Sequence, residues 1–113
     1  MLSPAAPADL VAYLRSIMAA IDPAGYTQAA RMLAGAELGA DIARLPASLP
    51  RAVASGSADT ITPPAGCQAV AREAGVPWQD LGPVGHACAV EAAVAVCELL
   101  SLPSSLPAKE TVS

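Results

Sequence analysis

The chain has 113 residues, which favours a single small domain, and its net charge at pH 7 is −4. Hydrophobic residues make up 54% of it and charged residues only 14%; phenylalanine is absent, so the apolar content is mostly alanine, leucine and valine. The few lysines and arginines are scattered and form no basic stripe, which argues against nucleic-acid binding.

The first half of the chain is predicted to be helical. Over about residues 7–20, apolar side chains recur at three- and four-residue spacing and form one stripe. A second helix should begin at Asp22 and Pro23, since Asp is a good N-cap and Pro fits the first helical position. This helix is expected to stop near Gly35. A short third helix over about 38–45 should end before the next prolines.

The second half is predicted to be a strand–helix–strand–helix unit. Residues 51–55 are interpreted as a short buried strand, although their alanines are weak strand formers. A helix over about 64–74 begins at a Pro-Pro pair and stops at Gly75, and residues 76–81 form the second strand candidate. A final helix is expected over 87–102. This order predicts a parallel β-α-β unit in which the first helix makes the crossover.

These elements divide the chain into three parts. Residues 1–49 form a helical segment, and residues 50–102 form the β-α-β-α unit. Residues 103–113 are a Ser- and Pro-rich tail that we expect to be disordered. The fold class is therefore predicted to be α/β.

Two polar residues follow the two predicted strands, where α/β folds place functional groups. Asp59 comes shortly after the first strand, and His86, the only histidine, follows the second. Because adjacent parallel strands end at the same edge of a sheet, we expect the two side chains to lie within hydrogen-bond reach. A carboxylate that holds an imidazole in one tautomer is the arrangement that a general base needs. Taken singly, each residue is as well explained as a turn former or an ordinary histidine.

At this point the chain resembles the C-terminal third of an α/β-hydrolase. The resemblance rests on Gly56-x-x-Asp59 with Pro63 soon after, then Gly85-His86 with Glu91 five residues on. The segment Asp22-Pro23-Ala24-Gly25-Tyr26 is similar to the end of the cap in the 3-oxoadipate enol-lactonase and small-esterase branch, so residues 1–49 resemble a cap remnant. Family order places the acid before the histidine, as here. The resemblance implies that Asp59 and His86 are the acid and the base of a catalytic triad.

The nucleophile of such a triad is missing. The family places it in a G-x-S-x-G elbow between a strand and a helix, and no serine or cysteine here has glycine on both sides at that spacing. Gly39-Ala40-Asp41-Ile42-Ala43 resembles the aspartate elbow of dehalogenases, but no strand precedes it. We therefore expect Asp41 to be a surface or helix N-terminal carboxylate. The loop that would form the family's oxyanion hole is also missing.

Other candidate residues favour structural roles. Glu91 should lie in the first turns of the last helix, where a carboxylate suits the helix dipole, and Trp78 could line a pocket but is more typical of a core. The cysteines have no C-x-x-C pair, so no metal, cofactor or disulfide is expected and small buried thiols are the simplest interpretation; they are Cys67, Cys88 and Cys97. The first residues lack a secretory signal, and 87–102 is too short to span a bilayer, so we expect a cytoplasmic protein away from membranes.

The leading hypothesis is a C-terminal fragment or subunit of a hydrolase for esters or enol-lactones, inactive alone and dependent on a nucleophile-bearing partner chain. The alternative is a non-catalytic, self-associating helical protein or a decayed gene product. A sheet of two strands leaves an open edge and bare apolar surface, so both hypotheses predict association with another chain or copy.

Overall fold

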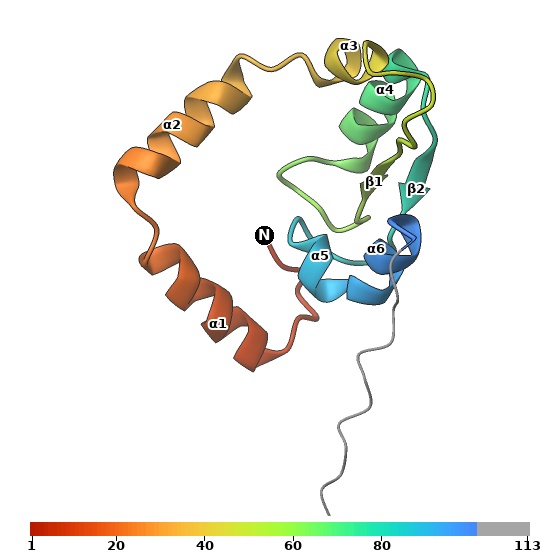
Figure 1. The fold of residues 1–113 in the computed structure, drawn as a ribbon. Coiled ribbons are helices and arrows are strands. Elements are labelled where there is room, and N and C mark those ends of the chain that lie inside the picture. The colour runs from red at the N-terminus through yellow and green to blue at the C-terminus, as the bar shows by residue number, and fades with distance from the viewer. Residues whose placement is uncertain (102–113) are drawn as a thin grey trace, which may run out of the picture.

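A computed structural model describes residues 1–101, and the predicted disordered tail, 103–113, lies outside these residues. The described part contains helices and a small sheet (Figure 1). The elements are α1 (Ala8–Ala19), α2 (Pro23–Ala34), α3 (Leu38–Ala43), β1 (Val53–Ser55), α4 (Pro64–Ala74), β2 (Trp78–Asp80), α5 (Cys88–Glu91) and α6 (Ala93–Leu99).

The two N-terminal helices begin and end as the sequence predicts. The Asp22 carboxylate accepts a hydrogen bond from the Gly25 backbone N–H at 2.9 Å, which caps α2, and Pro23 occupies its first position. However, neither α1 nor α2 buries a single residue. Figure 1 shows them as an arc beside the rest of the molecule, which we call the helical arm (residues 8–34). A cap remnant of the kind that the resemblance implies would pack near the strands, but α1 and α2 do not pack extensively there.

The sheet consists of β1 and β2, which pair in parallel. Val53 lies opposite Trp78, and Ser55 lies opposite Asp80. Helix α4 connects the strands and packs on both, so the predicted parallel β-α-β arrangement and the α/β class are confirmed. Gly75 ends α4 with a φ of 68°, a left-handed conformation that suits glycine.

Among the helices of the first 49 residues, only α3 packs extensively on this unit, and it does so against α4. Gly39 is buried at the contact, where a Cβ atom would collide with the carboxylate of Glu73. Arg51, just before β1, donates a 2.9 Å hydrogen bond to the carbonyl of Ile42 and ties α3 to the sheet. Glycine in this segment therefore serves close helix packing.

The apolar core is small. Among the described residues, the buried hydrophobic side chains are Ala71, Ala74 and Leu81. Large apolar side chains of the helical arm remain open; Met32 is 71% exposed and Leu33 is 62% exposed. Because burial of apolar area supplies most of the folding free energy, the described part of the chain has little margin of stability by itself.

The last predicted helix is interrupted. It forms α5 and α6, which are separated at Ala92, where φ is −127° and ψ is 43°. The N-terminal segment lies beside α5, and the Ala87 N–H donates to the Met1 carbonyl at 3.0 Å (Figure 1). Across residues 1–101, no helix combines the length and the apolar character needed to cross a membrane.

Candidate catalytic dyad

The loops after β1 and β2 are bonded to each other along the backbone. The Ser57 N–H donates to the Gly82 carbonyl at 2.8 Å, and the Ala58 N–H donates to the Val84 carbonyl at 3.1 Å. Gly56 makes this approach possible, because a Cβ atom there would collide with the carbonyl of Val84. The two loops are therefore joined along one edge of the sheet.

Asp59 sits in the first of these loops with every oxygen engaged. Its Oδ1 accepts backbone N–H bonds from Ile61 and Thr62, both at 2.9 Å. Its Oδ2 accepts the Thr62 hydroxyl at 2.8 Å and lies 3.0 Å from Nδ1 of His86. The predicted closeness of Asp59 and His86 is confirmed, and we call these two residues the dyad. Asp59 is 6% exposed, whereas 38% of the His86 side chain is exposed, so the carboxylate is buried and the ring is open to solvent on one side.

The surroundings keep Asp59 ionised. Burial by itself raises the pKa of this carboxyl, but hydrogen bonds from the Thr62 backbone, the His86 ring, the Thr62 hydroxyl and the Ile61 backbone outweigh it and lower the pKa to about 2. An ionised carboxylate can only accept hydrogen bonds, so Nδ1 of His86 carries a proton. The uncharged ring then has its lone pair on Nε2, which is the atom a general base uses.

Thr62 is a functional candidate that the sequence analysis missed. Its hydroxyl contacts both members of the pair, at 2.8 Å from Oδ2 of Asp59 and 3.0 Å from Nδ1 of His86. The signal for it was present, because Asp followed three residues later by Thr, just before Pro-Pro, is a pattern in which a carboxylate caps the backbone and the hydroxyl beside it.

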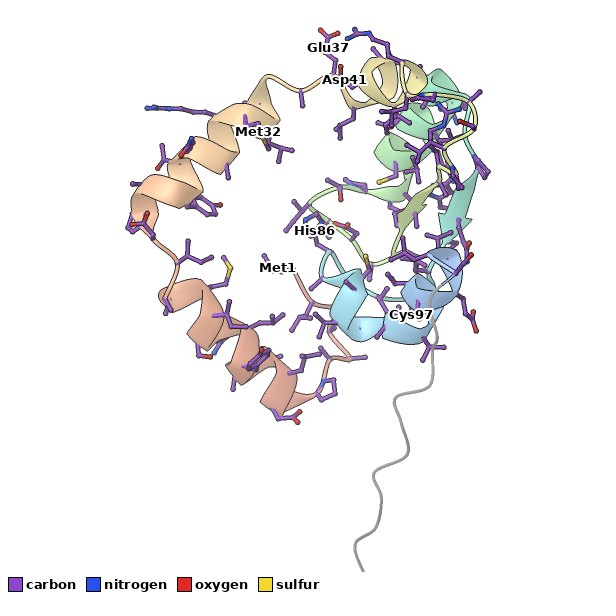
Figure 2. The ribbon with its side chains drawn as sticks, viewed as in Figure 1. Met1, Met32, Glu37, Asp41, His86 and Cys97 are labelled. Carbon is purple, nitrogen blue, oxygen red and sulfur yellow. The ribbon has the colours of Figure 1, made fainter. Side chains whose placement is uncertain are left out.

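Glu91 anchors the histidine loop from its other side. Its carboxylate accepts the Gly85 N–H at 2.8 Å, the Ser3 N–H at 3.0 Å and the Ser3 hydroxyl at 2.5 Å. Burial raises the pKa of Glu91, but these hydrogen bonds and the positive N-terminus outweigh it and lower that pKa. Figure 2 shows Met1 near His86, on the side of the unit that faces the helical arm. Glu91 therefore joins the N-terminal segment to the residue before His86.

Within residues 1–101 no serine hydroxyl is bonded to His86, and the hydroxyl that reaches the ring, Thr62 Oγ1, contacts Nδ1 and Asp59 rather than Nε2. The Ser57 hydroxyl donates to the Gly82 carbonyl, the Ser3 hydroxyl is held by Glu91, and Ser55 accepts the indole N–H of Trp78 at 2.9 Å. Trp78 is half-buried, and this hydrogen bond links β2 to β1.

Asp41 lies on α3, well separated from His86 in Figure 2. Its side chain is 50% exposed, caps the Glu37 N–H at 3.2 Å and pairs with Arg44 at 3.3 Å. Asp41 lies within a helix that no strand precedes, so the segment lacks the strand–turn–helix geometry of a nucleophile elbow.

The three cysteines are half-buried and form no disulfide. The Cys67 thiol donates to the Thr62 carbonyl at 3.4 Å. Within the described part of the chain, no three His, Cys, Asp or Glu side chains gather in a way that could hold a metal ion.

Comparisons with models of protein families, with curated proteins and with solved structures gave no match to this chain.

Proposed function

We propose that this chain supplies the acid and the base of an α/β-hydrolase that acts on carboxylic esters or enol-lactones, and that a second chain supplies the nucleophile. The observation that carries the proposal is the bond between the buried Asp59 carboxylate and Nδ1 of His86, on two interlocked loops at the ends of parallel strands. The order of acid and base along the chain agrees with that family.

In the proposed enzyme, His86 transfers the protons and Asp59 stabilises the charged ring. In the complete enzyme, a serine oxygen of the partner attacks the ester carbonyl while Nε2 of His86 takes the serine proton. His86 then gives this proton to the leaving oxygen, and an acyl-enzyme remains. Water attacks the acyl carbon, Nε2 takes a proton from it and returns one to the serine. Asp59 stabilises the imidazolium in both steps and stays ionised, as its lowered pKa favours.

The test is reconstitution with a neighbouring reading frame that encodes a strand–G-x-S-x-G–helix segment. The two chains, co-expressed, should hydrolyse an aryl ester or an enol-lactone, whereas neither chain should do so alone. His86→Ala and Asp59→Asn should each lower kcat by about a thousandfold or more. Asp41→Asn, a matched control outside the dyad, should leave the rate unchanged. Absence of such a reading frame, or an inactive complex, would overturn the proposal.

A second candidate is a non-catalytic protein that self-associates through its helices. The specific observation in its favour is that the helical arm buries none of its residues. In that case association should be the same in wild type and in a His86→Ala, Asp59→Asn double variant, and no reading frame that carries a nucleophile elbow should lie nearby.

A further inference from the structure

The Thr62 hydroxyl completes a triangle of three polar atoms with Asp59 and His86. Oγ1 lies 2.8 Å from Oδ2 of Asp59, Oδ2 lies 3.0 Å from Nδ1 of His86, and Nδ1 lies 3.0 Å from Oγ1. Each side of the triangle is short enough for a hydrogen bond. The question is which atoms hold the two protons available to it.

Only one arrangement satisfies all three atoms. The ionised Oδ2 of Asp59 has no proton, so the Thr62 hydroxyl donates to it and turns its own lone pairs toward Nδ1. A proton on Nδ1 then has two acceptors, Oδ2 and Oγ1. If the ring carried its proton on Nε2 instead, the Nδ1 lone pair would face the carboxylate. The Thr62 hydroxyl has one proton, so it could then donate to Nδ1 only by giving up its hydrogen bond to Oδ2 of Asp59.

The local chain also holds the hydroxyl in place. The backbone N–H of Thr62 donates to Oδ1 of Asp59 at 2.9 Å, so one residue contacts both carboxylate oxygens. The β-branch of threonine restricts its χ1 angle, which limits how far the hydroxyl can turn away. The carbonyl of Thr62 accepts the Cys67 thiol from the start of α4.

We propose that Thr62 is a positioning residue that selects the Nδ1–H form of His86 and sets the direction of its ring. Through the second acceptor, Thr62 keeps Nε2 free and aimed away from Asp59, where a nucleophile of the partner chain must approach. The tautomer part stands on the geometry alone, and its catalytic meaning rests on the proposed function.

The test is a nitrogen NMR measurement of the neutral His86 ring in the full chain, at a pH where the ring is uncharged. Wild type should show Nδ1 protonated in most molecules. Thr62→Val keeps the side-chain shape and the backbone N–H but removes one acceptor, so the ratio of Nδ1–H to Nε2–H should fall about fivefold, the effect of one ordinary hydrogen bond.

Two further variants separate positioning from folding. Thr62→Ser restores a hydroxyl and should return the ratio to within about twofold of wild type. Thr60→Val makes the same change two residues away, at an exposed threonine whose hydroxyl is not bonded to Asp59 or His86, and should leave the ratio unchanged. Trp78 fluorescence reports whether each variant is folded, since Trp78 is the only tryptophan.

The inference is overturned if wild type carries its proton mainly on Nε2, which can be measured whether or not any variant folds. A folded Thr62→Val with an unchanged ratio overturns it as well. These results are distinct from failure of the proposed function: a ratio that responds to Thr62 in a chain that never forms an active complex leaves Thr62 as a positioning residue and removes the hydrolase role.

Discussion

The helical arm and the β-α-β unit come from one chain of uniform, alanine-rich composition, yet they differ in what they pack against. The arm has well-formed helices and a capped start at Asp22, but none of its residues is buried. The unit has strands of three residues each, and loops that bond backbone to backbone over 25 positions or more. Helical periodicity thus predicts which face of the arm is apolar, whereas long-range hydrogen bonds determine which segments of the chain are fixed against one another.

The largest expected effect concerns association. Since Met32 and Leu33 are 71% and 62% exposed, we expect the chain to self-associate or aggregate when no partner is present. Sedimentation over a wide concentration range measures this directly. Replacing both residues by Glu should shift the distribution toward monomer, whereas Gln28→Glu, which adds charge to the same helix without removing apolar surface, should shift it much less.

A single monomeric species of the wild-type chain, with a cooperative thermal transition, would contradict this expectation. It would mean that the arm finds a closed packing in its own chain, and the fragment interpretation would lose its physical support.

The second effect concerns the contact between the two dyad loops. Gly56→Ala places a methyl group against the Val84 carbonyl, so the loops must separate, and we expect a loss of about 1–3 kcal/mol in the free energy of unfolding. Gly66→Ala is the matched control, since a methyl there in α4 meets no atom within 4 Å and should stabilise the helix by about 0.5–1 kcal/mol. Denaturant titration followed by Trp78 fluorescence measures both. Equal effects at the two glycines would refute the close approach.

The third effect is a dependence of stability on pH. The folded pKa of Asp59 is about 2, below its ordinary value of 3.8, so the ionised group stabilises the fold fully above about pH 5 and loses this contribution as the pH falls from about 4 to 2. Asp59→Asn should therefore be less stable than wild type at pH 6, and the gap should narrow at pH 3. Glu91, whose pKa is also lowered, keeps part of the acid sensitivity in the variant. A gap that does not change with pH would contradict the assigned hydrogen bonds.

The smallest effect tests the independence of the arm. Asp22→Ala removes the N-cap of α2 and should lower helix stability by about 1 kcal/mol, visible as a loss of circular dichroism helix signal. Because α2 does not pack extensively on the unit, the unfolding midpoint reported by Trp78 should stay the same. A parallel shift in both signals would show that the arm and the unit fold together.

Local chemistry made much of this fold predictable. Asp22, Pro23 and Gly75 act through their own backbone and side-chain preferences, so the helix ends they mark could be found from neighbouring residues alone. The closeness of Asp59 and His86 was also predictable, because each follows one of two short strands that pair in parallel. Lack of space for a side chain explains the glycine in each motif. A Cβ atom at Gly56 would collide with the Val84 carbonyl, and one at Gly85 would collide with the N-terminal segment.

Long-range contacts account for what the sequence did not reveal. The break at Ala92 adjoins Glu91, whose carboxylate is bound to Ser3, 88 positions away along the chain. No run of alanine and valine carries a signal for such a bond. Nor does an apolar stripe reveal that the arm stays uncovered in its own chain. Thr62 was missed for another reason: its role depends on the direction of a hydroxyl, which spacing alone does not specify.

Hydrolysis of an activated aryl ester by the purified chain, wild type against His86→Ala, tests the central claim most directly. Under the proposed function, Asp59 and His86 are an acid and a base that lack a nucleophile in their own chain, so the two proteins should hydrolyse the ester at the same rate, equal to background. A wild-type rate well above background that disappears in His86→Ala would contradict this account, because it would show that a residue of this chain already serves as the nucleophile.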